Sequence, residues 1–321
     1  MQDKKTYANL WEKPIRIGTR GSKLALWQAK FIAEKIEAQG VPTEIITIET
    51  KGDKILNKSL AKIGSKGIFT AEIEDKLRDG SIDIAVHSAK DVQADLAEDL
   101  KIIAFSEREN PADVVVSFNK NTKLTHFDNS FIVGTSSTRR VALLRHMYPN
   151  IRTADARGNL TTRMKKLEEG YYDALILAYA GVLRMNYHEY IVQYLDINTF
   201  VPAVGQGAIL VEASCELNEA QAQQLRQWLN HEPTEWCITA ERAFLKEFQG
   251  GCSVPVFGYA KLENETLTLT AGVVSLDGQR IVKQTAQAHY LQAERLGIEV
   301  AQQVIAHGGR EVIQSLKKHT S

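Results

Sequence analysis

The chain has 321 residues, of which 44% are hydrophobic, and its 39 lysine and arginine residues balance 39 aspartate and glutamate residues. This length and apolar content are enough for two or three domains with buried cores. The balanced charge excludes a global field that would attract nucleic acid or an anionic membrane, so electrostatic recognition must come from local clusters.

The first third of the chain alternates predicted strands and helices. Residues 15–18 predict a strand, Ser22 can cap a helix that runs to about residue 40, and residues 44–48 predict the next strand. Residues 52–67 have no clean period and carry several lysines between glycines. That pattern suits either a mobile loop beside an anionic ligand or a solvated loop. A helix over 70–78 follows.

The stretch 81–92 is the centre of the predicted fold. Its apolar residues 84–86 favour a buried strand, and Ser88, Lys90 and Asp91 follow where a parallel sheet presents ligand groups beyond its carboxyl edge. Asp91 is therefore the first candidate for a functional carboxylate. The alternative is that Asp91 caps a helix or forms an ion pair with Lys90.

Several other predicted strands also end in basic or hydroxyl residues. The helix from Ser137 to about residue 146 can bind an anion at its N-terminus, because its free N–H groups and dipole add to Arg139 and Arg140. Several strand ends that direct cations to one place describe a cleft for an anion, although a surface ion pair is the alternative for any single arginine. The cationic candidates are Arg20, Arg139, Arg140, Arg157, Arg163, Arg184, Lys62, Lys66 and Lys90.

Two crossovers predict two α/β lobes with a hinged cleft. The polar connection at 106–111 leaves the first lobe, and the proline- and glycine-containing segment 200–207 returns to it. From about residue 217 the pattern changes to helices and three antiparallel strands that turn at 263–265 and 276–279, which predicts a C-terminal α+β domain. Further helices are predicted over 159–170, 218–229, 234–248, 293–306 and 310–317. The predicted domains are 1–106 with 208–225, 107–207, and 226–321.

The reactive and charged residues of the sequence indicate a ligand with several carboxylates. No Walker loop or dinucleotide GxGxxG motif follows a strand, which disfavours a nucleotide. Asp91 among many cations should be ionised and is able to stabilise a cationic intermediate. Cys252 follows two glycines that leave its thiol open, which favours covalent attachment, although a lone cysteine is more often a small buried residue.

No metal site is predicted. The eight histidines contain no HExxH motif, and His87 is interpreted as a core residue or one that supports a site. The three cysteines are odd in number and form no CxxC pair, which argues against a disulfide framework and a thiolate metal site. Cys215 and Cys237 are predicted to be buried free thiols.

The N-terminal segment 1–7 lacks the apolar core of a secretory signal. No later stretch is long enough to span a bilayer. We therefore expect a cytoplasmic protein.

Seven motifs follow one another in the chain, at residues 17–28, 66–69, 83–92, 134–140, 157–159, 201–208 and 250–255. In this order they resemble the porphobilinogen deaminase family, also called the hydroxymethylbilane synthases, which form tetrapyrroles in haem biosynthesis. The resemblance covers nearly the whole chain. It implies two periplasmic-binding-protein-like α/β lobes, a C-terminal α+β domain, a dipyrromethane cofactor and a monomer.

The resemblance also assigns roles. Cys252 corresponds to the covalent attachment site of the dipyrromethane, and Asp91 to the catalytic aspartate that assists loss of ammonia from porphobilinogen. Lys62 and Lys66 match a mobile active-site loop, whereas Phe69 and Gln206 lie in matching motifs without an assigned role. The residues matching positions that bind carboxylates of cofactor or substrate are Arg20, Ser22, Lys90, Ser137, Arg139, Arg140, Arg157, Arg163 and Arg184.

The implied activity is the head-to-tail condensation of four porphobilinogen molecules on the two-ring primer, followed by release of linear hydroxymethylbilane. One departure is Gln93, where many relatives carry proline, and it is expected to change loop stiffness without loss of chemistry. The alternative function is a periplasmic-type module that only binds a dicarboxylate or oxyanion. Neither a nucleic acid nor a membrane is an expected partner.

Overall fold

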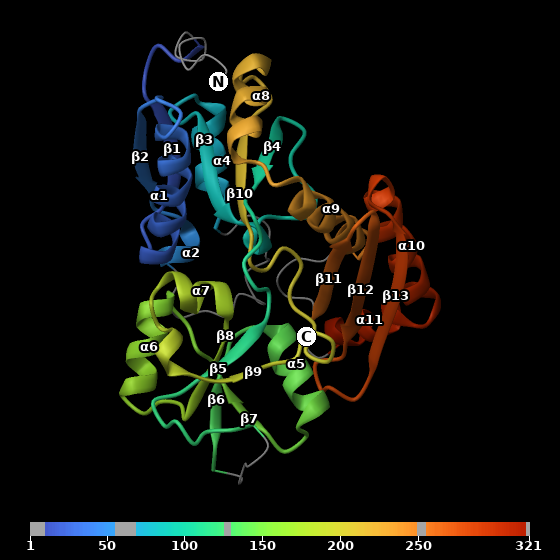
Figure 1. Cartoon of the computed structure of the whole chain (residues 1–321). Coiled ribbons are helices and arrows are strands. Elements are labelled where there is room, and N and C mark those ends of the chain that lie inside the picture. The colour runs from blue at the N-terminus through green and yellow to red at the C-terminus, as the bar shows by residue number, and fades with distance from the viewer. Residues whose placement is uncertain (1–9, 55–68, 125–129, 249–254, 319–321) are drawn as a thin grey trace. The chain divides into compact units, whose positions relative to one another are not determined.

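The computed structural model describes residues 10–54, 69–124, 130–248 and 255–318 (Figure 1). The described residues form two compact units, with one chain crossing after Arg108 and the return crossing after Gly207. The first unit contains 10–54, 69–108 and 208–235, and the second contains the described parts of 109–207 and 236–318. The three-domain division predicted from the sequence stays a prediction.

The first unit is built on a five-stranded sheet in the order β2-β1-β3-β10-β4. β1 (Ile15–Arg20) pairs in parallel with both β2 (Thr43–Ile48) and β3 (Ile84–Ser88). β10 (Ile209–Ser214) returns from the second unit and lies antiparallel between β3 and β4 (Leu100–Phe105). The strands predicted over 15–18, 44–48 and 84–86 are confirmed, and the carboxyl ends of β1 and β3 meet at one edge of the sheet.

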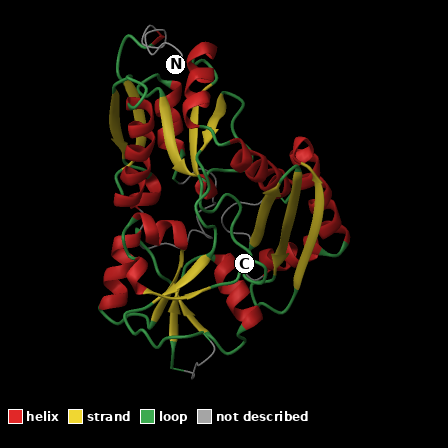
Figure 2. Cartoon of the chain, in the orientation of Figure 1, coloured by secondary structure: helices red, strands yellow, loops and turns green. Residues whose placement is uncertain are grey.

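Helices cover both faces of this sheet (Figure 2). On one face, α1 (Lys23–Glu37) and α8 (Glu219–Leu229) share an apolar core with β1 and β3. On the other face, α4 (Ala71–Arg78) packs Ile73 and Leu77 against Ala85 of β3. The alternation of a strand's side chains explains this arrangement, since neighbouring residues of β3 supply the two cores. A short helix, α2 (Lys51–Lys54), follows β2.

The second unit contains a similar sheet in the order β7-β6-β8-β5-β9. β6 (Ile132–Gly134) pairs in parallel with β7 (Arg152–Ala154) and β8 (Ala174–Ala178). β5 (Asp113–Val116) lies antiparallel between β8 and β9 (Ile191–Tyr194). The helices that follow the parallel strands are α5 (Thr138–Met147), α6 (Leu160–Glu168) and α7 (Tyr179–Arg184). β9 and α7 are too short and too irregular in pattern to be predicted.

The C-terminal part of the second unit is an antiparallel three-stranded sheet packed on helices. Its strands are β11 (Val256–Glu263), β12 (Thr266–Val274) and β13 (Ile281–His289), joined at the two predicted turns. A Cβ at Gly297 would lie 2.2 Å from the Ala240 carbonyl oxygen, so glycine permits the close approach of α10 to α9. The helices are α9 (Glu232–Glu247), α10 (Ala293–Ala306) and α11 (Gly309–Lys318). These elements confirm the predicted fold class of two α/β sheets and a C-terminal α+β region.

The structure also tests the predicted burial of two cysteines and the predicted lack of a membrane-spanning segment. Cys237 is buried as predicted, but the prediction for Cys215 is wrong, because Cys215 follows the end of β10 and is exposed. Among the described residues, no helix combines the length and apolar composition needed to cross a bilayer.

Candidate active site

A pocket lies in the first unit at the carboxyl ends of β1 and β3. Its polar lining includes Arg20 from β1, Gln28 from α1, and His87, Ser88 and Asp91 from β3 and the 3₁₀ turn η2 (Ala89–Asp91). Ser22, Phe69 and Thr70 complete the lining on the sides of α1 and α4. Arg20, Ser22 and Asp91 were predicted from the sequence, and the structure brings these three together.

Asp91 is a half-buried carboxylate in this pocket. Within the described part of the chain it has no hydrogen bond or ion pair, which disfavours the interpretations of a helix cap and of a pair with Lys90. Beside it, the Gln28 amide nitrogen lies 2.8 Å from Ser88 Oγ and holds the end of β3. A carboxylate to which no described residue donates is available for a cationic or N–H-donating ligand.

Arg20 is oriented by two contacts on the pocket wall. Its guanidinium forms an ion pair with Asp53 of α2, and its Cζ atom lies 4.3 Å from the centroid of the Phe69 ring. Burial opposes ionisation of Asp53, but hydrogen bonds from Arg20 and Thr50 outweigh it and lower the pKa of Asp53. Ser22 caps α1, accepting a hydrogen bond from Ala25 N at 3.3 Å.

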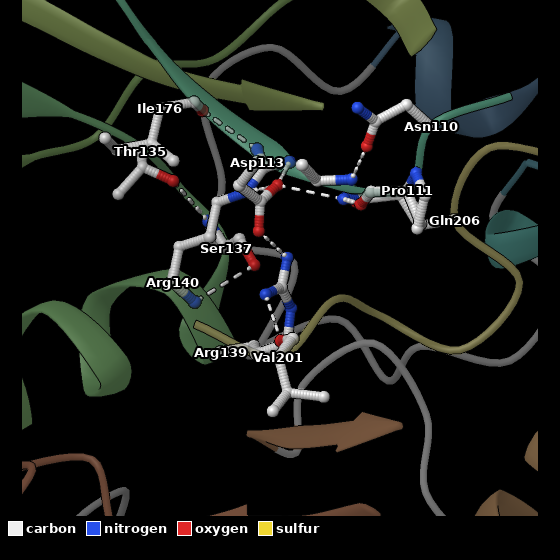
Figure 3. A network of polar contacts seen from close by, with 11 residues as sticks. Asn110, Pro111, Asp113, Thr135, Ser137, Arg139, Arg140, Ile176, Val201 and Gln206 are labelled. Carbon is white, nitrogen blue, oxygen red and sulfur yellow. Dashed lines mark hydrogen bonds and ion pairs between the residues drawn. The ribbon is translucent and has the colours of Figure 1, made fainter. Parts of the chain in front are cut away.

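In the second unit, the predicted residues at the N-terminus of α5 surround a buried carboxylate (Figure 3). Asp113, fully buried at the start of β5, accepts a hydrogen bond from Arg139 Nη2 at 2.7 Å and from Arg140 Nη2 at 2.7 Å. The same two guanidiniums also donate to the carbonyl oxygens of Val201 and Ile176 at 2.8 and 2.9 Å. Arg139 and Arg140 are therefore held together by one acid.

The electrostatics of this cluster explain why Asp113 stays charged. Burial raises its pKa, but the charges of Arg139 and Arg140 outweigh burial and hold the pKa of Asp113 at about 2. Gln206 Nε2 adds a hydrogen bond to Asp113 at 3.0 Å and one to the Pro111 carbonyl at 2.6 Å. Gln206, left without a role by sequence, is thus part of the cluster.

The cluster keeps unused hydrogen-bonding capacity. Arg139 Nε and Ser136 Oγ are buried and have no partner among the described residues. Ser137 caps α5 through a bond from Arg140 N at 3.4 Å. Two guanidiniums and one carboxylate leave one excess positive charge, so this end of α5 suits an anionic group.

Three further predicted arginines follow strands of the same sheet. These are Arg157 after β7, Arg163 in α6 and Arg184 in α7. Arg157 Nε is 3.4 Å from Asp155 Oδ2 in the connection from β7 to α6. Arg163, near the start of α6, donates from Nε to the Gly158 carbonyl of that connection at 2.9 Å. Gly158 has a φ of 98°, which favours glycine at that turn. Arg184 donates to the Gly207 carbonyl at 2.7 Å, and burial lowers the pKa of Arg184 to about 10 against the opposing charge of Glu109.

Three predicted site residues fall outside the described residues. These are Cys252 and the two loop lysines, Lys62 and Lys66. Lys90 lies in η2 beside Asp91. No group of three or more histidine, cysteine, aspartate or glutamate residues suited to a metal ion occurs in the described ranges.

Sequence reasoning missed several polar residues at both places. Gln28 and Thr70 line the pocket, Asp113 organises the arginine cluster, and Glu212 of β10 contacts His87. Gln28, inside the motif 17–28, and Thr70, next to Phe69, are the two that motifs could have indicated. Asp113 and Glu212 lie inside apolar strands far from their partners in sequence, and no local signal pairs them.

Comparison with known proteins gives two family models in sequence order. The model described as "Porphobilinogen deaminase, dipyromethane cofactor binding domain" matches residues 15–223, and the model described as "Porphobilinogen deaminase, C-terminal domain" matches residues 236–306. Among solved structures, a periplasmic substrate-binding protein of an ABC transporter from Coxiella burnetii is similar with a TM-score of 0.42 and 14% identity, covering 68% of this chain and 93% of that one.

Curated relatives match over nearly their whole length. The porphobilinogen deaminase of Desulfosudis oleivorans is 46% identical over 304 residues, covering 95% of this chain and 98% of the relative. That of Cytophaga hutchinsonii is 47% identical over 309 residues, covering 96% of this chain and 99% of the relative. These matches confirm the resemblance seen in the seven sequence motifs, and the chain belongs to the porphobilinogen deaminase family.

Proposed function

We propose that this protein deaminates porphobilinogen and condenses four molecules of it head to tail on a covalently bound dipyrromethane, releasing linear hydroxymethylbilane. The observation that carries this proposal is the Asp91 carboxylate, which lies in a pocket without a partner among the described residues. Family membership favours this activity over the alternative of a module that only binds an anion.

Asp91 is proposed as the catalytic residue. Porphobilinogen presents a pyrrole N–H and loses ammonia from its aminomethyl group, so positive charge develops on the substrate. A fixed carboxylate that accepts the N–H hydrogen bond stabilises that charge more than it stabilises the neutral ground state. Ser88 and Gln28 support the strand end that leads to Asp91.

The cationic residues are proposed to bind the substrate's two carboxylates. In the first unit, Arg20 is held by Asp53 and Phe69 in an orientation that leaves it on the pocket wall. In the second unit, Arg157, Arg163 and Arg184 lie at or near the carboxyl edge of β7-β6-β8. Each charge-assisted hydrogen bond to a carboxylate contributes about 1.5 to 3 kcal/mol.

The described residues fit a dipyrromethane. The buried Arg139 Nε and Ser136 Oγ lack partners in the described ranges, and the excess positive charge beside Asp113 suits an anionic group such as a pyrrole carboxylate. We propose that Lys90, Asp91, Ser137, Arg139, Arg140 and Arg157 hold the group and that Cys252 attaches it. When bound, it supplies the first pyrrole carbon to which substrate is joined.

The proposed function also includes a domain organisation, an oligomeric state and a cellular location. We propose the three domains 1–106 with 208–225, 107–207, and 226–321, and we assign Lys62 and Lys66 to the mobile active-site loop that the family resemblance implies. We also propose that the protein is a monomer, as the family resemblance implies, and that it works in the cytoplasm. Light scattering after gel filtration and cell fractionation test these two points.

Intact-mass spectrometry tests the proposed function directly. The purified protein should carry a covalent dipyrromethane that is absent from Cys252→Ser, and it should convert porphobilinogen to hydroxymethylbilane. Cys237→Ser is the matched control and should keep the adduct, because Cys237 is buried in the helical core. A protein that makes the bilane without any adduct would overturn the attachment, and one that only binds porphobilinogen would support the binding module.

A further inference from the structure

The condensation leaves one proton to be removed in every cycle. The C–N bond of the aminomethyl group breaks and its electron pair leaves with ammonia. A C–C bond then forms between the freed methylene and the α-carbon of another pyrrole. That α-carbon loses its hydrogen as a proton, and the C–H electron pair returns to the ring. Asp91 is poorly suited to take this proton if it must stay ionised to stabilise the cation, so a second group is needed.

His87 lies in the same pocket as Asp91 and is tied to a buried acid. His87 is one of the residues that line the pocket, and its Nε2 atom is 3.1 Å from Glu212 Oε2 of the neighbouring strand β10. His87 is 5% exposed and Glu212 is fully buried. Because Nε2 is engaged by Glu212, Nδ1 is the hydrogen-bonding atom of the ring that remains for a ligand.

The strands place this pair by register. His87 is opposite Leu210 in the antiparallel ladder, so Glu212 is its diagonal neighbour on the same face of the sheet. The pairing fixes the ring against the sheet and sets which nitrogen carries the proton. Glu212 Oε1 has no hydrogen-bond partner among the described residues, so the imidazole is the acid's one polar contact there.

The charged groups around the imidazole come from every neighbouring element. Glu212 contributes from β10, Glu74 and its partner Arg78 from α4, Arg20 from β1, and Asp91 from η2. Burial and the charge of Glu212 raise the pKa of Glu74, which shows that α4 brings a second acid toward this pair. α1 brings no titratable group to the pocket, since Gln28 is uncharged. Glu212 is the acid in direct contact with the ring, so it is the counter-charge for an imidazolium formed there.

We propose that His87 is the general base of the condensation, its Nδ1 accepting the proton of the pyrrole α-carbon while Glu212 orients the ring and stabilises the imidazolium. This inference rests on the proposed function. The proton then passes to the departing ammonia or to solvent, which restores neutral His87 for the next cycle. Glu212 is a positioning residue, because it acts through His87.

The test combines His87→Gln and Glu212→Gln with a surface control. Gln at 87 can still donate to Glu212 but cannot take a proton, so the fold should persist by circular dichroism. General base catalysis typically contributes about 10² to 10⁴ in rate, and His87→Gln should lower kcat by that order. Glu212→Gln should lower it less. His289→Gln, which removes an exposed histidine 3.8 Å from Glu265, should leave kcat unchanged.

Two readouts separate a base from a structural residue. First, the decrease of kcat/KM at low pH should disappear in His87→Gln. Second, porphobilinogen deuterated at its free α-carbon should show a primary kinetic isotope effect that is larger in His87→Gln than in the unaltered protein. In the unaltered protein, the isotope effect should grow as the pH falls, because the neutral imidazole becomes scarce. That measurement stands even if both variants fail to fold.

The outcomes distinguish this inference from the proposed function. If the unaltered protein forms no bilane, the proposed function fails. If it forms bilane and His87→Gln keeps the decrease of kcat/KM at low pH and the normal isotope effect, only the role of His87 is overturned. An isotope effect that does not change with pH in the unaltered protein would overturn it as well.

Discussion

Asp91 and Asp113 are two aspartates at strand ends beside arginines, yet their surroundings differ. Asp113 is fully buried and shared between Arg139 and Arg140, whereas Asp91 is half-buried in a pocket and has no partner in the described ranges. Counting the named groups, Arg139, Arg140 and Asp113 leave one positive charge. Arg20, which forms an ion pair with Asp53, and Asp91 leave one negative charge.

The two aspartates therefore have different roles, which a search for an acid beside arginines in the sequence would not distinguish. A buried acid with saturated hydrogen bonds organises cations and stabilises the fold, whereas an acid without a protein partner is available for a ligand's positive charge. The substrate proposed here needs both, since it carries carboxylates and develops a cation. Each unit, taken by itself, contains one of these two kinds of acid: Asp91 in the first and Asp113 in the second.

The strongest test of this contrast is Asp113→Asn. Removing one partner of a buried ion pair leaves two guanidiniums without their counter-charge, which costs about 3 to 5 kcal/mol. Urea unfolding of the second unit should report the loss. Glu263→Gln, which removes an exposed partner of Lys261, should leave the urea midpoint unchanged. An Asp113→Asn protein as stable as the unaltered one would mean that Asp113 does not organise the cluster.

Asp91→Asn should have the next largest effect, on activity. The amide keeps the size of the side chain but cannot stabilise a cation, so kcat should fall about 10² to 10³-fold, equivalent to about 3 to 4 kcal/mol. The midpoint of urea unfolding should stay unchanged, which is the reverse of the Asp113 result. Asp75→Asn, at an exposed acid on α4, is the control. Near-normal turnover in Asp91→Asn would remove Asp91 from the mechanism.

Acid should destabilise the second unit through Asp113. Its pKa in the folded protein is about 2, below the ordinary value of 3.8, so its contribution is complete above pH 3.8 and is lost as the pH falls through 2. The lowering corresponds to about 2 kcal/mol. Urea midpoints measured between pH 5 and pH 2 should fall less steeply in Asp113→Asn. Parallel curves for the two proteins would show that other acids dominate.

Substitutions at the helix caps should give the smallest losses of stability, and each unit offers one cap for a direct comparison. Ser22 caps α1 in the first unit and Ser137 caps α5 in the second, through bonds of 3.3 and 3.4 Å. Ser22→Ala and Ser137→Ala should each cost about 1 kcal/mol of stability, whereas glycine at either position should cost only a few tenths. Thermal unfolding of the four variants measures this. Equal losses for alanine and glycine would contradict a capping role.

Local patterns predicted most elements of the fold. The caps Ser22, Ser137 and Asn218, the apolar strands and the turns near Asn264 and Gly278 are set by interactions within a few residues. The elements that were missed are α2, β9 and α7. They are too short to show a sequence period, and β9 gains its structure from its neighbour β5 in the sheet. The inserted antiparallel strand β10 also depends on a partner far along the chain.

For the site, the sequence by itself determined which residue types stand at the strand ends: Asp91 after β3, Arg20 at the end of β1 and Ser137 before α5. Only the tertiary structure decided their partners. Arg139 and Arg140 pair with Asp113, which is 26 and 27 positions away in the sequence. His87 pairs with Glu212, which is 125 positions away. Burial and charge pairing act through space, so a linear pattern places a charged group without revealing whether another residue already neutralises it.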